Sequence, residues 1–402
     1  MVSSSVVGCG ASVLASDAPL AGTNLTPSIL VVGVGGGGCN AVNNMISRAL
    51  TGVDFLACNT DAQSLAQSLA HRTLHLGRTG LGAGASPRAG YDAAAFSYDA
   101  IMDELKGNNM VFLTAGMGGG TGTGASPVIA AAARELGILS VGIVTKPFPF
   151  EGGRRRRQAE EGISELEKYV DTLLVIPNEN LLSLGRNITM GNAFQAADGV
   201  LYEGIRGVTD LIVNPGLVNV DFADVTTVMS NKGRALMGSG EAEGDDRASV
   251  ATAQALANPL LENVNLAHAQ GVLVCISGGD DLTLFDVSTT TETIRASVDD
   301  DANIIFGSSY DPALPEGTIR VSVMVTGLDP TFKQRVAPAP ASAPSKSAIA
   351  QGVLTSAAKP AEPTAAKPAA SKSRAKPVEI SSIGQSVSDN AKSMWAFLKR
   401  HA

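Results

Sequence analysis

The segment "LTAGMGGGTGTGASP", residues 113–127, decides the fold of this chain. It reads as the end of an apolar strand, a run of glycines and the opening of a helix that we expect to begin near Pro127. The glycines let backbone amides approach an anion, because no Cβ atom stands in the way. Thr121 and Thr123 add hydroxyl donors, and the positive end of the helix points at whatever is bound. The segment therefore predicts a phosphate-binding turn.

A second glycine run, "ILVVGVGGGGCNAV" at residues 29–42, also joins a strand to a helix, which we expect to extend from about Asn40 to Ala49. Gly33, Gly35 and Gly38 match the G-x-G-x-x-G dinucleotide fingerprint, and Asp61 stands near the spacing expected of a ribose contact. Taken alone, this loop leaves a dinucleotide-binding oxidoreductase open. Two such loops on successive strands instead indicate a longer phosphate chain that is held from both sides.

Motifs and composition exclude several other classes. The phosphate loop G-x-x-x-x-G-K-[ST] is absent and "NKGR" at 231–234 lacks the acid of N-K-x-D, which excludes a Ras-like protein. The net charge of −8 argues against nucleic acid as a partner. No apolar run approaches the roughly 20 residues that span a bilayer, so direct membrane insertion is not expected. Four cysteines without a C-x-x-C pair fit reduced thiols in the cytoplasm.

The order of apolar and helical segments predicts an α/β fold. Strands are expected within residues 29–34, 53–61, 109–117, 139–148 and 171–178, separated by helical stretches, which favours a parallel sheet covered on both faces. A long helical pattern from about Asn192 to Val213 follows. Further apolar runs between Val220 and Leu328 predict a second, smaller α/β unit.

Several motifs occur in an order that resembles the FtsZ family, the bacterial tubulin-like cell-division GTPases. They are "NTDAQ", "GLGAGA", "GMGGGTGTGA", "KPFPFEG", "IPNENLL", "NVDFADV" and "RALMGSG", and "VLYEG" with "DANIIFG" resembles the alphaproteobacterial branch. The resemblance implies a Rossmann-like GTPase domain joined by a long central helix to the smaller domain. It also implies GTP, GDP and Mg²⁺ as ligands and head-to-tail polymerisation into filaments of the cytoplasmic division ring at mid-cell.

Two alternatives stay open beside that interpretation. One is a hydrolysis-poor, GTP-binding member of the same family that co-polymerises with an active copy. The other is the NAD(P)-binding oxidoreductase that the first glycine loop allows, although it leaves the second loop unexplained.

Composition and resemblance together divide the chain into six parts. We expect a flexible N-terminal extension (1–27), a GTP-binding domain (28–190), a central helix (191–214), a C-terminal activating domain (215–329), a disordered Pro/Ala/Lys-rich linker (330–380) and a partner-binding peptide (381–402). By resemblance, residues 391–402 bind membrane-tethering and regulatory division proteins. Apolar anchors such as Trp395 suit folding in a partner's groove.

The resemblance also implies a set of nucleotide-contacting residues in five groups. In order, these groups belong to the first glycine loop, the segments near the γ-phosphate, the signature loop (residues 118–124), the ribose-contacting pair and the surroundings of guanine. They are Gly36, Gly37, Gly38, Cys39 and Asn40; Asp61, Ala83, Gly84 and Ala85; Gly118, Gly119, Gly120, Thr121 and Gly122; Glu151 and Arg155; and Asn178, Phe194 and Asp198. Cys39 stands where the family has glycine, so we expect a side chain close to phosphate.

The expected catalytic residues lie in "NVDFAD", residues 219–224. Two carboxylates, Asp221 and Asp224, can polarise a water and help to order a cation near a γ-phosphate. The resemblance implies that this loop, with Asn219, lies on the face opposite the nucleotide and completes the active site of the next subunit.

Overall fold

A computed structural model of the chain describes residues 26–184, 189–214, 216–230, 233–258, 260–261, 269–299 and 302–328. The expected linker and partner-binding peptide lie outside these residues, as does the N-terminal extension up to residue 25.

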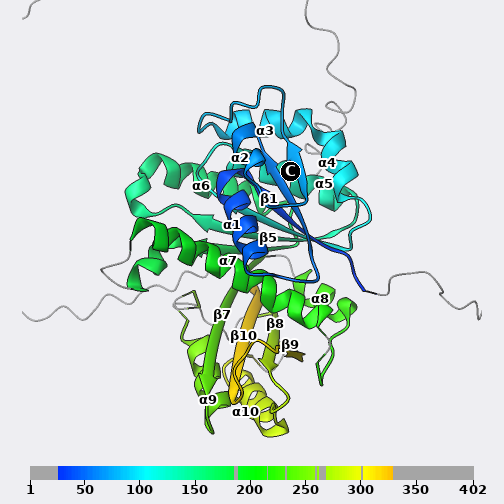
Figure 1. Cartoon of the computed structure of the whole chain (residues 1–402), viewed down its shortest axis with the longest axis vertical. Coiled ribbons are helices and arrows are strands. Elements are labelled where there is room, and N and C mark those ends of the chain that lie inside the picture. The colour runs from blue at the N-terminus through cyan, green and yellow to red at the C-terminus, as the bar shows by residue number, and fades with distance from the viewer. Residues whose placement is uncertain are drawn as a thin grey trace, which may run out of the picture. The chain divides into compact units, whose positions relative to one another are not determined.

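The fold is built on one sheet in the strand order β3-β2-β1-β4-β5-β6-β7-β10-β8-β9 (Figure 1). The strands are β1 (Ile29–Val34), β2 (Asp54–Asn59), β3 (Arg72–His75), β4 (Met110–Gly116), β5 (Leu139–Lys146), β6 (Thr172–Pro177), β7 (Gly233–Glu243), β8 (Gly271–Gly278), β9 (Asn303–Tyr310) and β10 (Thr318–Leu328). All pairings from β3 to β7 are parallel, whereas β10 is antiparallel to both β7 and β8. The pairing of β6 with β7 is the narrow point of the sheet, since it comprises three residue pairs.

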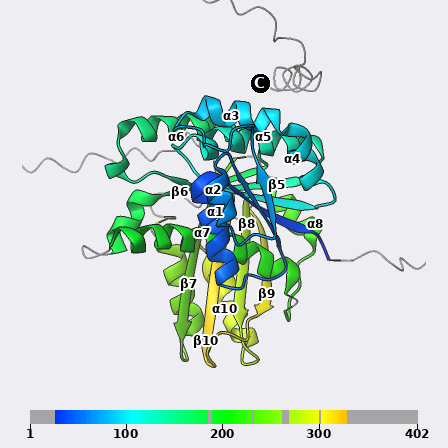
Figure 2. The ribbon, with the colours of Figure 1, turned by 45° about the horizontal axis from the view of Figure 1, so that its top comes forward.

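Helices cover both faces of the parallel part (Figure 2). The α-helices of the described residues are α1 (Gly35–Ser47), α2 (Ala62–Ala66), α3 (Pro87–Phe96), α4 (Tyr98–Leu105), α5 (Thr121–Glu135), α6 (Gly153–Leu166), α7 (Met190–Val213), α8 (Phe222–Met229), α9 (Arg247–Leu256) and α10 (Leu284–Arg295). Of these, α9 packs on β7 and β10, and α10 packs on α9. Helices α3 to α6 lie together on one face, and α1 and α7 lie on the other. Among these helices, none combines the length and the apolar character that a membrane crossing requires.

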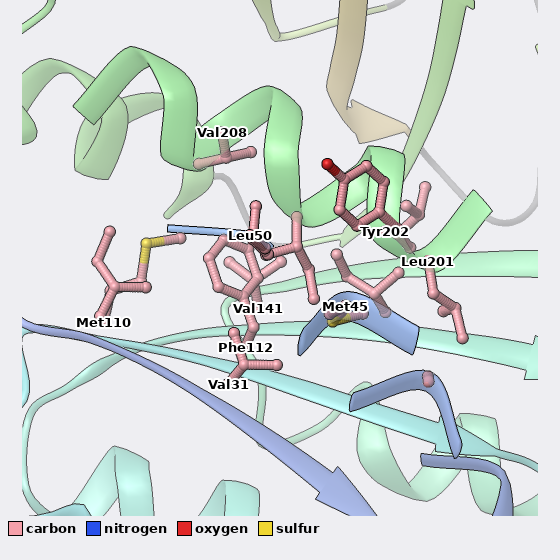
Figure 3. Packing of buried hydrophobic residues seen from close by; sticks show 14 of the residues in the cluster. Val31, Met45, Leu50, Met110, Phe112, Val141, Leu201, Tyr202 and Val208 are labelled. Carbon is pink, nitrogen blue, oxygen red and sulfur yellow. The ribbon is translucent and has the colours of Figure 1, made fainter. Parts of the chain in front are cut away.

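The main core lies between the parallel strands and the α1–α7 pair (Figure 3). Alternate residues of the strands, such as Val31, Phe112 and Val141, point toward this face, as the period of two in a strand requires. They meet Met45 of α1 and Leu201 of α7. Helix α7 also contacts β8 and β9, so it packs against both parts of the sheet.

The α/β fold expected from the sequence is confirmed, but two helices begin earlier than the sequence predicts. Helix α1 begins at Gly35 where a start near Asn40 was expected, and α5 begins at Thr121 with Pro127 inside it. Close packing holds these glycine-rich first turns in helical form, although glycine alone disfavours a helix. A Cβ on Gly124, for example, would lie 2.0 Å from the carbonyl oxygen of Pro87.

Candidate functional site

A cavity of about 380 Å³ opens where the parallel strands end and α1 and α5 begin. It lies at the carboxyl edge of the sheet, where ligands bind in open α/β folds. Most of the sequence-predicted nucleotide residues line it: Gly36, Gly37, Asn40, Gly119, Gly120, Thr121, Gly122, Glu151, Arg155, Asn178, Phe194 and Asp198. Gly38, Cys39, Asp61, Ala83, Gly84, Ala85 and Gly118 do not.

The first turns of α1 and α5 lie against each other at one end of the cavity. A Cβ on Gly35 would stand 2.8 Å from the amide nitrogen of Gly122, so this approach requires glycine, as does the φ of +70° at Gly35. Gly36 and Gly119 have open space where a Cβ would be. Two helix N-termini therefore converge on one space, which favours a ligand with negative charge.

Gly38 and Cys39 face the protein interior. A Cβ on Gly38 would lie 2.3 Å from the carbonyl oxygen of Thr114, so this glycine allows α1 to pack closely on the sheet. The Cys39 thiol is buried and lies 3.7 Å from the Gly33 carbonyl and 3.8 Å from that of Cys58. The expectation of a Cys39 side chain close to phosphate is therefore wrong, because the helical turn directs it into the core. Its burial raises the pKa of the thiol to about 12.

The segments expected near a γ-phosphate pack behind the signature loop. Thr60 and Thr121 share a buried hydroxyl–hydroxyl hydrogen bond of 2.7 Å. Asp61 is the N-cap of α2, where its carboxylate accepts from the amide of Gln63 at 3.0 Å. A Cβ on Gly120 would stand 2.8 Å from that of Ala83, which shows how closely residues 83–85 approach the signature loop.

The rim of the cavity is shaped by the packing of the loop at Gly118 against α6 and by an ion pair. Gly118 has a φ of +99°, and a Cβ there would lie 2.7 Å from the carbonyl of Arg155, so the loop fits against α6 only with glycine. The Arg155 guanidinium forms an ion pair with Glu151, and both side chains line the cavity. The adjacent arginines at 154, 156 and 157 are exposed and do not line it.

The end of the cavity away from the two helix N-termini is lined by an aromatic ring and by polar side chains. Phe194 of α7 meets Phe148 edge-to-face, with ring centroids 5.3 Å apart. Asn178 is 4% exposed, and its Oδ1 atom is buried without a hydrogen-bond partner. Burial raises the pKa of Asp198 to about 6, while the positive charge of Arg48 opposes this rise. The Asp198 carboxylate is therefore the acceptor that this end of the cavity offers, whereas the Asn178 Oδ1 atom is buried.

The three residues expected to be catalytic lie away from this cavity, and none of them lines it. The Asn219 side chain accepts from the amide of Gly216 at 3.0 Å, and Asp221 and Asp224 are exposed at the start of α8. The far end of α8 reaches the amino edge of the sheet, where Thr172 donates to the Met229 carbonyl.

The length of β6 separates that edge from the cavity. The strand runs from Thr172 at the amino edge to Pro177, directly before the cavity residue Asn178. Six residues of strand span about 17–20 Å. The cavity and α8 therefore lie at opposite edges of the same parallel sheet.

Sequence reasoning missed some lining residues. Thr145, at the carboxyl end of β5, Pro147 and Met117 line the cavity, as do Ala197 and Leu201 of α7. A polar residue at the end of a parallel strand is a recognisable signal for Thr145. The apolar lining residues carry no such signal, because apolar residues of this kind also occur throughout the hydrophobic core.

No group of three or more His, Cys, Asp or Glu side chains within the described residues could hold a metal ion.

The fold and the cavity define a class of protein, namely an α/β protein that holds a phosphate-bearing ligand between two helix N-termini. Comparison with known proteins narrows this class. Residues 28–186 match the Tubulin/FtsZ family, GTPase domain, and residues 233–329 match the FtsZ family, C-terminal domain.

Individual relatives agree with these matches. The chain is 55% identical over 322 residues to the cell division protein FtsZ of Rickettsia conorii, which covers 78% of this chain and 71% of that protein. It is 54% identical to the FtsZ of Caulobacter vibrioides, over 80% of this chain and 64% of that one. A solved structure of an empty FtsZ dimer from M. jannaschii has a TM-score of 0.72 at 41% identity, covering 75% of this chain and 88% of that chain. The chain therefore belongs to the FtsZ family, and its relatives include alphaproteobacterial members, as the sequence predicts. The comparisons give no support to the oxidoreductase or to the hydrolysis-poor alternative.

Proposed function

We propose that this chain binds GTP in the cavity and hydrolyses it when a second copy supplies the segment 219–224. The single observation that carries the proposal is the separation of the two halves of the site. The cavity occupies the carboxyl edge of the sheet, Asp224 does not line it, and the Met229 end of α8 reaches the amino edge, which supports a site that a second copy completes. Head-to-tail stacking of two copies brings these edges together. Repetition of that contact produces a filament.

The base end of the cavity suits guanine. Guanine presents two adjacent donors, N1–H and the exocyclic amine, whereas adenine lacks this pair. The carboxylate of Asp198, which lines the cavity, has two acceptor oxygens that can meet them. Phe194 supplies a flat apolar surface for the base.

The phosphate end suits a triphosphate. Amides of the first turns of α1 and α5 donate to phosphate oxygens, with open space at Gly36 and Gly119. Arg155 and Glu151 stand on the rim, where a ribose would lie. Mg²⁺ held by the phosphates would neutralise part of their charge. The neighbouring copy's Asp221 and Asp224 would orient and polarise the attacking water.

The biological setting follows from the family. The relatives are cell division proteins, and we propose that this chain forms filaments of the division ring in the cytoplasm. Its C-terminal residues 391–402 would bind membrane-tethering and regulatory division proteins.

The experiment that tests this function measures phosphate release from GTP against protein concentration, with Mg²⁺ present and ATP as the control nucleotide. We expect turnover per chain to rise above a threshold concentration and to fall when Asp224→Ala protein is mixed in. Asp103→Ala is the matched control, because Asp103 is an exposed acid paired with Lys106 on α4. Turnover that does not depend on concentration would show that one chain contains the whole active site.

A further inference from the structure

Arg48 joins the two helices that border the nucleotide cavity. It follows α1 directly, while the first turn of the same helix lines the phosphate end. Its guanidinium lies over the ring of Tyr202 on α7, 5.1 Å from the centroid. Met45 and Leu50 pack with Tyr202 at this contact between helices (Figure 3). A cation over an aromatic face is favourable, so the contact holds one helix to the other.

The same guanidinium lies against α7 at Gly199. A Cβ at that position would lie 3.7 Å from Nη2 and 3.9 Å from Nη1 of Arg48, so the arginine occupies the space beside a residue without a side chain. Gly199 directly follows Asp198. Arg48 therefore touches the helical turn that presents the base-contacting carboxylate.

That turn of α7 separates two cavities. Asp198 and Leu201 face the nucleotide cavity, whereas Gly199 and Glu203 line a second cavity of about 250 Å³. Arg48 also lines the second cavity. The guanidinium thus lies behind the nucleotide site, where it can act on the site without touching a ligand.

Charge supports the same conclusion. Arg48 lowers the pKa of Asp198 against the effect of burial, and it acts in the same sense on Glu203. The other charged groups that face the nucleotide cavity are Glu151 and Arg155, which form an ion pair with each other. Among the described residues, Arg48 is thus the cation that acts on Asp198.

We propose that Arg48 is a positioning residue for guanine recognition, acting through the turn of α7 that carries Asp198. The inference rests on the proposed function, since it assumes that Asp198 accepts from guanine. Loss of Arg48 leaves this carboxylate less well held and more easily protonated.

The test uses the full-length chain and measures its affinity for GDP and for IDP, which lacks the exocyclic amine, at pH 6.5 and pH 8. The variants are Arg48→Met, which removes the charge, and Arg48→Lys, which keeps it. Arg88→Met is the matched control, because Arg88 is also exposed over a tyrosine ring but lines neither cavity.

We expect Arg48→Met to weaken GDP binding by about threefold at pH 6.5, since removal of the positive charge raises the pKa of Asp198 and lowers the ionised fraction of this carboxylate. The loss should be much smaller at pH 8, where Asp198 is ionised in both the wild type and the variant. The preference for GDP over IDP should fall in parallel. Arg48→Lys should restore most of both, and the Arg88→Met control should match the wild type.

Two results would overturn the inference. One is a GDP affinity and GDP/IDP ratio in Arg48→Met that equal the wild-type values at both pH values. The other is a loss of the same size at pH 6.5 and pH 8 that persists in an Asp198→Asn background, because it would show that Arg48 does not act through Asp198. A wild-type chain without preference for guanine over adenine nucleotides would instead refute the proposed function itself.

Discussion

Replacing Asp198 with Asn should make the nucleotide-free protein more stable while it weakens guanine binding. Burial raises the pKa of Asp198 from its ordinary value of 3.8 to about 6, and the charge of Arg48 only partly opposes this. The folded protein therefore binds this proton more tightly than the unfolded chain does. The contribution of Asp198 to stability is therefore most favourable below pH 4 and becomes less favourable as the pH rises toward 6, after which its cost stays constant.

The size of the effect follows from the shift in pKa. A difference of about two units corresponds to about 3 kcal/mol at neutral pH, and solvent screening at this half-buried position reduces it to about 1.5–3 kcal/mol. Asn has nearly the same shape but carries no charge at any pH. Asp198→Asn should thus gain about 1.5–3 kcal/mol at pH 7.5, and about half of that at pH 5.

Urea denaturation of nucleotide-free protein at the two pH values measures this difference, with Asp103→Asn as the control. The control removes an exposed charge from α4 and should change stability by less than about 0.5 kcal/mol. If Asp198→Asn is no more stable than wild type at pH 7.5, or if its gain does not depend on pH, the buried charge carries no cost and the reasoning is refuted.

Three further predictions concern packing, hydrogen bonding and metal. Gly38→Ala should lower stability by about 1–3 kcal/mol in thermal unfolding, because its Cβ would overlap the Thr114 carbonyl, whereas Gly36→Ala, with open space, should weaken nucleotide binding and leave stability unchanged. Thr60→Val should cost about 0.5–1.5 kcal/mol in urea denaturation, since the Thr121 hydroxyl loses its 2.7 Å partner, and an unchanged midpoint would contradict this. EDTA should leave the melting temperature of the nucleotide-free protein within about 1 °C, because the described residues contain no cluster that could hold a metal, and a larger drop would show a metal bound without nucleotide.

Much of the fold could be predicted because its strands are long and apolar. The run "TIRVSVMVTGL" coincides with β10, and "LSVGIVTKPF" contains β5. Strands with few apolar residues gave no comparable signal, and β3 (Arg72–His75) and β7 (Gly233–Glu243) were not predicted. Strand β7 contains glycines at positions where a Cβ would meet backbone of α9, so tertiary packing rather than local preference makes it a strand.

The site shows the same division between local and distant causes. The spacing of the glycines located the two loops, because only glycine allows the backbone conformations and close approaches that such loops require. It could not tell which glycines face a ligand and which face the protein. Gly38 packs on Thr114 and Gly118 packs on α6, whereas Gly36 opens into the cavity, and these differences depend on partners more than 30 residues away. The direction of the Cys39 side chain was predicted wrongly because the turn of α1 that contains it directs the thiol into the core, beside Gly33 and Cys58.

The placement of the cavity and α8 at opposite edges of the sheet determines how many complete active sites a filament contains. If each complete site takes one half from each of two neighbours, a filament of n copies contains n − 1 complete sites. The subunit at one end then holds a nucleotide without a neighbour's catalytic segment, and the segment 219–224 of the subunit at the other end has no neighbouring nucleotide to act on. Turnover per chain is therefore lower in short filaments than in long ones, and the turnover per chain measured in solution depends on the mean filament length.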